Sequence, residues 1–101
     1  MSGINSVKNS ELMISMPETF AIEEAGILRH ELNEHIGRGL VDFVLDFKSC
    51  TFIDSTGLGV IVAAYKKCTE KKGSIKLKNL NDNVRKVFML TRLDRVFEVI
   101  D

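Results

Sequence analysis

The chain has 101 residues, and 45% of them are hydrophobic, which is enough for one hydrophobic core but not for two. Fourteen basic and fourteen acidic residues cancel, so the net charge draws the protein neither to nucleic acid nor to an anionic membrane surface. The longest apolar run, residues 58–65, is far shorter than the ~20 residues of a membrane-spanning helix, and the N-terminus lacks a secretion signal. We therefore expect one cytoplasmic domain over residues 1–101, with proteins or small molecules as partners and no direct contact with nucleic acid or membrane.

The cysteines and histidines predict neither a disulfide framework nor a metal site. Cys50 and Cys68 are too few for a scaffold, have no CxxC spacing and lie in apolar stretches, so we expect reduced, buried thiols. His30 and His35 share no metal-ligand spacing with them and lie in a glutamate-rich segment. We expect both histidines at the surface, and no metal.

The first half of the chain predicts a hairpin followed by an amphipathic helix. Residues 4–8 and 12–16 are strand candidates around a turn at 9–10, and the only proline, Pro17, marks a further turn. From Ile22 to Gly37 or Gly39 the apolar residues recur at helical spacing. The residues predicted to face the core are Ala25, Leu28, Leu32 and Ile36.

The second half predicts two strands that alternate with two helices. Residues 41–47 are a core strand, residues 58–71 a helix that ends before Gly73, and residues 74–80 a half-buried strand. Asp82 is expected to cap a third helix that carries Val84, Val87 and Phe88 on one side, and residues 97–100 form a last strand or helical turn. The order β-β-α-β-α-β-α predicts an α/β fold with a sheet covered by helices.

The helix over 58–71 has more apolar residues than one face can hold. Leu58, Ile61, Tyr65 and Cys68 can face the core at spacings of three and four. Some of the remaining apolar residues, which are Val60, Val62, Ala63 and Ala64, should then be exposed. An exposed apolar patch at this place would suit a protein interface, whereas a fully buried helix would have the same sequence.

The turn over residues 54–57, Asp-Ser-Thr-Gly, is the most informative stretch. It places two hydroxyls at a helix N-terminus, where unpaired N–H groups and the helix dipole would stabilise a phosphoserine. Gly57 and Gly59 would let another backbone approach closely. The alternative is that Asp54 or Ser55 only caps the helix and the glycines serve tight packing. The physics of the turn favours neither interpretation.

Residues 53–60, Ile-Asp-Ser-Thr-Gly-Leu-Gly-Val, resemble the Asp-Ser-Ser/Thr-Gly-Leu-Gly signature of bacterial anti-sigma factor antagonists in the STAS family. The likeness continues in residues 41–47 before the signature and in 73–80, 84–88 and 93–97 after it. The resemblance implies a single STAS domain over residues 1–101. It also implies a small mixed β-sheet of four to five strands with helices packed on one side.

The resemblance further implies a binding switch rather than an enzyme, with no cofactor and a monomer when free. The unphosphorylated form would bind an anti-sigma factor that is itself a serine kinase of the histidine-kinase-like ATPase type, and so release a sigma factor. That kinase would phosphorylate Ser55, with Thr56 as the second candidate, and a PP2C-type phosphatase would reverse the reaction. Partner contacts are expected at Asp54, Ser55, Thr56, Gly57, Leu58, Gly59, Val60, Glu18 and Phe20.

The turn over residues 17–21 departs from the family pattern. Relatives often carry a glycine followed by an acidic residue there, and in this chain Glu18 matches one acidic position while Phe20 or a neighbour replaces a common aspartate. An alternative function is a non-switching STAS subunit of a lipid-transport ATPase complex or a signalling scaffold, in which Ser55 would only cap a helix.

Other functional classes have weaker support. Ser55 has no GxSxG elbow, so a hydrolase is not expected, and the two glycines lack the third glycine or the lysine of a nucleotide-binding loop. The lysines at the end of the same helix are expected to be a solvated terminus rather than a nucleic-acid site: Lys66, Lys67, Lys71 and Lys72.

Overall fold

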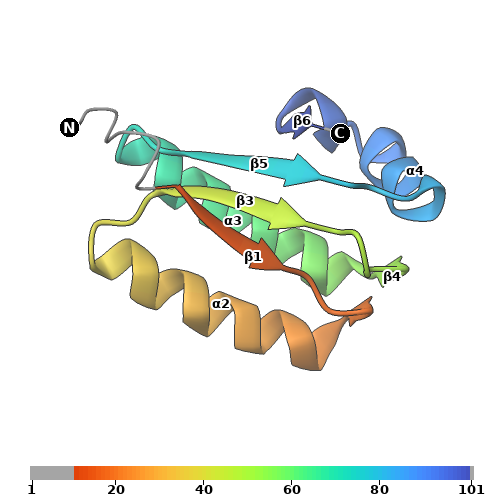
Figure 1. Ribbon diagram of the computed structural model, residues 1–101, viewed down its shortest axis with the longest axis horizontal. Helices are drawn as coiled ribbons and strands as arrows, with labels where there is room; N and C mark the ends of the chain where they lie inside the picture. The colour runs from red at the N-terminus through yellow and green to blue at the C-terminus, as the bar shows by residue number, and fades with distance from the viewer. Residues whose placement is uncertain (1–10, 101) are drawn as a thin grey trace.

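The computed structural model describes residues 11–100, which form a sheet with helices on one face (Figure 1). The elements in chain order are β1 (Leu12–Ser15), β2 (Thr19–Phe20), α2 (Ile22–Gly37), β3 (Asp42–Asp46), β4 (Phe52–Ile53), α3 (Ser55–Glu70), β5 (Ser74–Lys78), α4 (Asp82–Leu90), the short 3-10 helix η1 (Leu93–Arg95) and β6 (Glu98–Ile100). This α/β architecture agrees with the fold class predicted from the sequence.

The main sheet has the strand order β1-β3-β5-β6, and all of its described pairings are parallel. β3 lies between β1 and β5, and its middle residues, Phe43, Val44 and Leu45, are buried on both faces of the sheet. β5 alternates as predicted, with Ile75 and Leu77 buried between less buried neighbours. The antiparallel partner of the predicted hairpin, residues 4–8, lies outside the described residues.

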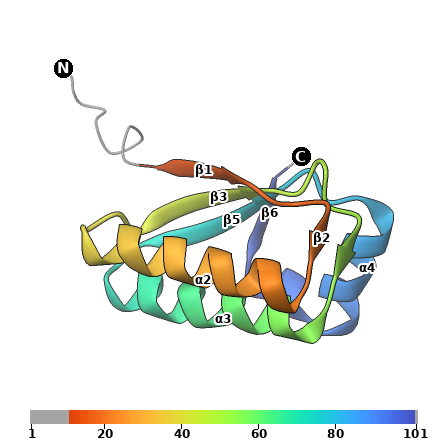
Figure 2. The same ribbon diagram turned by 90° about the horizontal axis from the view of Figure 1, so that it is seen from below.

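Both long helices cover the same face of the sheet. Figure 2 shows α2 and α3 side by side beneath β1, β3 and β5, with α4 at the end of the layer. The four residues predicted to form the core face of α2 are all buried. α4 joins the core through Phe88, whose ring meets those of Phe47 and Phe97 edge-on at centroid distances of 5.9 and 6.1 Å. The predicted one-sided packing is therefore confirmed.

Two helix starts differ from the predictions, and both differences follow from capping. α3 begins at Ser55 rather than at Leu58, because Asp54 is its N-cap and the first glycine is helical. α4 is capped by Asn81 rather than by Asp82, since the Asn81 side chain accepts a hydrogen bond from the N–H of Val84 at 2.9 Å. Asp82 instead lies in the first helical turn.

The cysteine prediction is confirmed, and the histidine prediction only in part. Cys50 and Cys68 are free and fully buried. Burial and the charge of Asp42 raise the pKa of the Cys68 thiol to about 11. The His30 side chain is 79% exposed, whereas that of His35 is only 26% exposed because its ring packs at 6.1 Å from the ring of Phe43.

Candidate functional site

The candidate site is the N-terminus of α3. The Asp54 carboxylate accepts a hydrogen bond from the N–H of Gly57 at 2.8 Å, and the Asp54 carbonyl accepts the first helical bond from Leu58 at 3.0 Å. Ser55 and Thr56 therefore occupy the first two helical positions, and both are exposed. Among residues 11–100 their hydroxyls and backbone N–H groups have no hydrogen-bond partner. The helix thus presents free donors beside two accessible hydroxyls.

A two-stranded ladder holds the turn over residues 17–21 against this helix terminus. β2 and β4 pair in parallel, with Thr19 opposite Phe52 and Phe20 opposite Ile53. The Glu18 carbonyl accepts from the N–H of Thr51 at 2.8 Å. Sequence patterns missed both strands, because strands of two residues have no periodicity to detect. The ladder nevertheless places Glu18 beside the segment that leads into Ser55.

The two glycines of the signature have different environments. A Cβ atom on Gly57 would lie 2.6 Å from Cδ2 of Phe20 and 2.7 Å from its carbonyl oxygen. A Cβ atom on Gly59 would meet nothing within 4 Å. Gly57 therefore serves the close packing of β2 on α3, as the packing interpretation expected, whereas Gly59 leaves a low point on an exposed helix face.

The structure separates the predicted contact residues into accessible and buried ones. Glu18, Ser55, Thr56 and Gly59 are exposed, and Asp54 and Leu58 are half-buried. Phe20, Gly57 and Val60 are buried, so the side chains of Phe20 and Val60 offer a partner little surface and Gly57 only its backbone. Phe20 in particular has no exposed surface, because it fills the space above Gly57.

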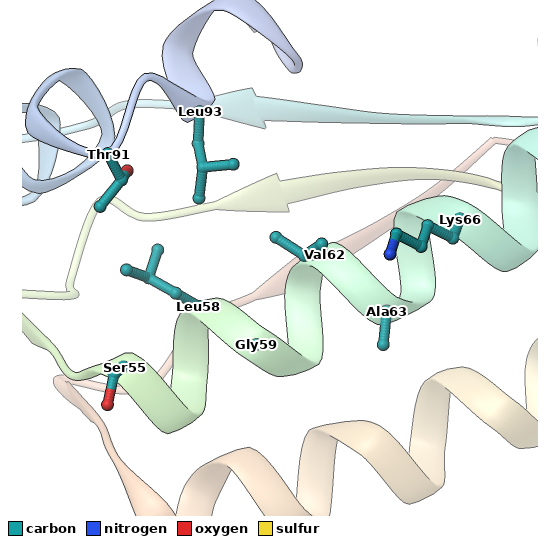
Figure 3. Close-up of a pocket in the computed structure, with 8 residues that line it drawn as sticks. All are labelled: Ser55, Leu58, Gly59, Val62, Ala63, Lys66, Thr91 and Leu93. Atoms are coloured by element: carbon teal, nitrogen blue, oxygen red, sulfur yellow. The ribbon is translucent and has the colours of Figure 1, made fainter.

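The face of α3 beyond the signature is partly open, as expected. Val60 and Ala64 are buried, whereas Val62 is half-buried and Ala63 is exposed. Val62 and Ala63 belong to a shallow groove of about 480 Å³ between α3 and the segment around η1. Figure 3 shows the eight lining residues, which are Ser55, Leu58, Gly59, Val62, Ala63, Lys66, Thr91 and Leu93. The groove therefore begins at Ser55 and continues along the helix.

The wall formed by Thr91 and Leu93 was not predicted as part of the site. No local signal marks these residues, because the tertiary fold brings them to α3. Tyr65 of α3 packs edge-on against Phe97 with a centroid distance of 4.9 Å, and the N–H of Phe97 donates to the Leu93 carbonyl at 3.1 Å. These contacts hold η1 beside α3.

Two hydrogen-bond groups fix the loop that leads into the site. The Asp46 carboxylate accepts from the side chain of Asn79 at 3.0 Å and from the backbone of Lys48 at 2.9 Å, and both bonds lower the pKa of Asp46. The Asn81 side chain donates to the carbonyl of Cys50, which joins the start of α4 to the same loop. Burial raises the pKa of the Cys50 thiol, so this residue is structural rather than reactive.

The described residues, 11–100, contain neither a metal-binding cluster nor a membrane-spanning helix. No group of three or more His, Cys, Asp or Glu side chains there could hold a metal ion. Each histidine instead lies near a glutamate on the same helix, His30 at 3.4 Å from Glu34 and His35 at 3.8 Å from Glu31. None of the described helices is both long and apolar enough to cross a membrane.

Comparison with known proteins identifies the family. The STAS domain model matches residues 4–101, nearly the whole chain. The chain belongs to the STAS family. The anti-sigma-B factor antagonist of Bacillus subtilis is 28% identical over 90 residues, which cover 89% of this chain and 82% of that protein. The STAS fold and the signature around Ser55 thus occur together here.

Solved structures of STAS proteins agree with the architecture. A crystal structure of a putative anti-sigma factor antagonist from Thermotoga maritima is 30% identical, with a TM-score of 0.80 over 88% of this chain and 79% of that one. The unphosphorylated anti-sigma factor antagonist SpoIIAA is 20% identical, with a TM-score of 0.73 over 88% of this chain and 77% of that one. At that identity SpoIIAA supports the fold alone.

Proposed function

We propose that this STAS protein is an anti-sigma factor antagonist whose unphosphorylated form binds an anti-sigma factor, and that phosphorylation of Ser55 abolishes this binding. The observation that carries the proposal is the exposed Ser55 hydroxyl at the first position of a capped helix, within the signature of that family. The relatives of 28 to 30% identity with antagonist names support the same function. The domain acts as a phosphate acceptor and a binding surface, not as a catalyst.

The helix terminus can accept a phosphate without a change of fold. A phosphoserine adds about −1.5 to −2 charge and strong acceptor oxygens. The free N–H groups of Ser55 and Thr56 and the positive end of the α3 dipole lie beside that position. Because Asp54 already accepts the N–H of Gly57, the cap stays intact when the phosphate arrives.

The effect of phosphorylation then falls on the partner. A surface that docks against the neutral Ser55 hydroxyl would meet the phosphate next to the half-buried Asp54 carboxylate. Two adjacent anions that lose water on binding cost a few kcal/mol, which is a factor of about 10² or more in affinity. The partner is an anti-sigma factor that is also a serine kinase of the histidine-kinase-like ATPase type, and a PP2C-type phosphatase resets the switch.

Intact-mass analysis tests the acceptor. The protein is incubated with ATP and the ATPase-type kinase from its own genome, in parallel with Ser55→Ala and Thr56→Ala. We expect one added phosphate on the wild type and on Thr56→Ala, and none on Ser55→Ala. Since both substituted residues are exposed, the variants should keep the far-UV circular dichroism of the wild type. No phosphate with any cognate kinase would overturn the switch and favour a structural STAS subunit.

A further inference from the structure

The groove between α3 and η1 is apolar along its floor and cationic at the end opposite Ser55. Figure 3 shows Leu58 and Val62 projecting from α3 toward Leu93. Lys66 is the charged residue among the eight that line the groove, and it is exposed. A groove of this composition suits a chain segment that carries an apolar side chain and, further along, an anion.

Lys66, the cation at this end of the groove, forms no ion pair within the described part of the chain. Within residues 11–100, Lys66 has no acidic group at ion-pair distance, although Glu70 lies one helical turn further on. Arg92 lies between the lining residues Thr91 and Leu93, is exposed, and likewise has no ion pair in residues 11–100. The groove itself therefore offers one unpaired cation, Lys66, to an incoming carboxylate, while Arg92 is an exposed chain neighbour of its second wall.

We infer that this groove binds an acidic–apolar segment of the anti-sigma factor, with the apolar side chain over Leu58, Val62 and Leu93 and a carboxylate at Lys66. The inference rests on the proposed function and specifies the chemistry of its partner. Ser55 and Lys66 are eleven positions apart on α3, which is about 16 Å along the helix axis. A segment of about five residues in extended conformation spans the same length.

The groove also connects partner binding to the switch. Ser55 forms one end of it, and Figure 3 shows the hydroxyl pointing away from Leu58 and Leu93, at the rim. A phosphate on Ser55 would thus lie beside the docked segment rather than under it. The carboxylate at Lys66 would lie about 16 Å from this phosphate, beyond the Debye length of about 8 Å at physiological salt, so the phosphate acts on the part of the partner that covers Ser55.

Calorimetric titration with the purified kinase, without ATP, tests the assignment. We expect Lys66→Glu to weaken binding about tenfold or more, because it replaces an attraction with a repulsion next to an apolar contact. Lys66→Arg keeps the charge and should bind like the wild type. Lys71→Glu is the control, since it makes the same change of charge at the C-cap of α3, outside the groove. It should bind within twofold of the wild type.

Zero-length carbodiimide coupling of the complex identifies the segment directly. We expect an amide between Lys66 and an Asp or Glu of a kinase peptide that contains apolar residues, and no such product with Lys66→Arg. If the wild type binds the kinase but Lys66→Glu binds equally well, the groove assignment is wrong and the proposed function stands. If the wild type does not bind any cognate kinase, both fail. A homodimer that Lys66→Glu dissociates would assign the groove to a second copy of the chain and overturn the inference.

Discussion

Gly57→Ala should destabilise the protein, whereas Gly59→Ala should stabilise it. The two positions lie in the same helix, and Ala gains about 1 kcal/mol over Gly at each from helix propensity. At Gly57 the new Cβ would lie 2.6 Å from the Phe20 ring and 2.7 Å from its carbonyl oxygen, and the oxygen cannot move unless β2 moves with it. Overpacking of this kind costs about 3 kcal/mol, so we expect a net loss of about 2 kcal/mol.

Gly59→Ala is the matched control for that change. Its Cβ meets nothing within 4 Å, so only the propensity term remains, and we expect a gain of about 0.5 to 1 kcal/mol in the free energy of unfolding. Urea denaturation of both variants gives the two free energies, and thermal melting should place Gly57→Ala roughly 10 °C below the wild type. The packing argument is refuted if Gly57→Ala is as stable as Gly59→Ala.

Three further outcomes follow from the same contacts. Asp54→Ala should lower the free energy of unfolding by about 1 kcal/mol in urea titrations, since it removes the N-cap of α3. Asp54→Ser can still cap the helix and should lose much less stability. Equal losses in the two variants would argue against capping. The lowered pKa of Asp46 means that its ionised form stabilises the fold above the ordinary carboxyl pKa of 3.8. That stability should be lost as the pH falls through the folded pKa, and a free energy of unfolding measured against pH should lack this component in Asp46→Asn. Because both cysteines are fully buried and the pKa of Cys68 is raised to about 11, neither thiol should react with a disulfide reagent at pH 8 until denaturant is added; prompt labelling of the folded protein would contradict this burial.

Most of the fold was predictable because it follows from local patterns. The apolar spacing in α2 and the alternation in β5 each reflect one buried face, and the structure buries the residues concerned. β2 and β4 were missed because a long-range ladder holds them. The start of α3 was placed too late because Gly57 has the appearance of a helix breaker, although the packing of Phe20 requires it within the helix.

The candidate site likewise combines residues that a local signature predicts with residues that only tertiary packing brings there. Ser55 and Asp54 are adjacent in a short signature, so the sequence alone predicts them as site residues, and the structure places both at the start of α3. Phe20 was predicted as a partner contact because it replaces a family residue at an altered turn, and its burial depends on a distant helix. The second wall of the groove, Thr91 and Leu93, depends on how the C-terminal segment packs on α3, which no local pattern encodes.

The most direct test of the central claim is the affinity of the cognate anti-sigma kinase for two preparations of this protein, unphosphorylated and phosphorylated on Ser55. Titration calorimetry without ATP gives both dissociation constants, and peptide mapping verifies the position of the phosphate. We predict binding of the unphosphorylated protein and affinity weaker by about 10² or more for the phosphorylated protein. Equal affinities, or a phosphate that resides on a residue other than Ser55, would contradict the proposed switch.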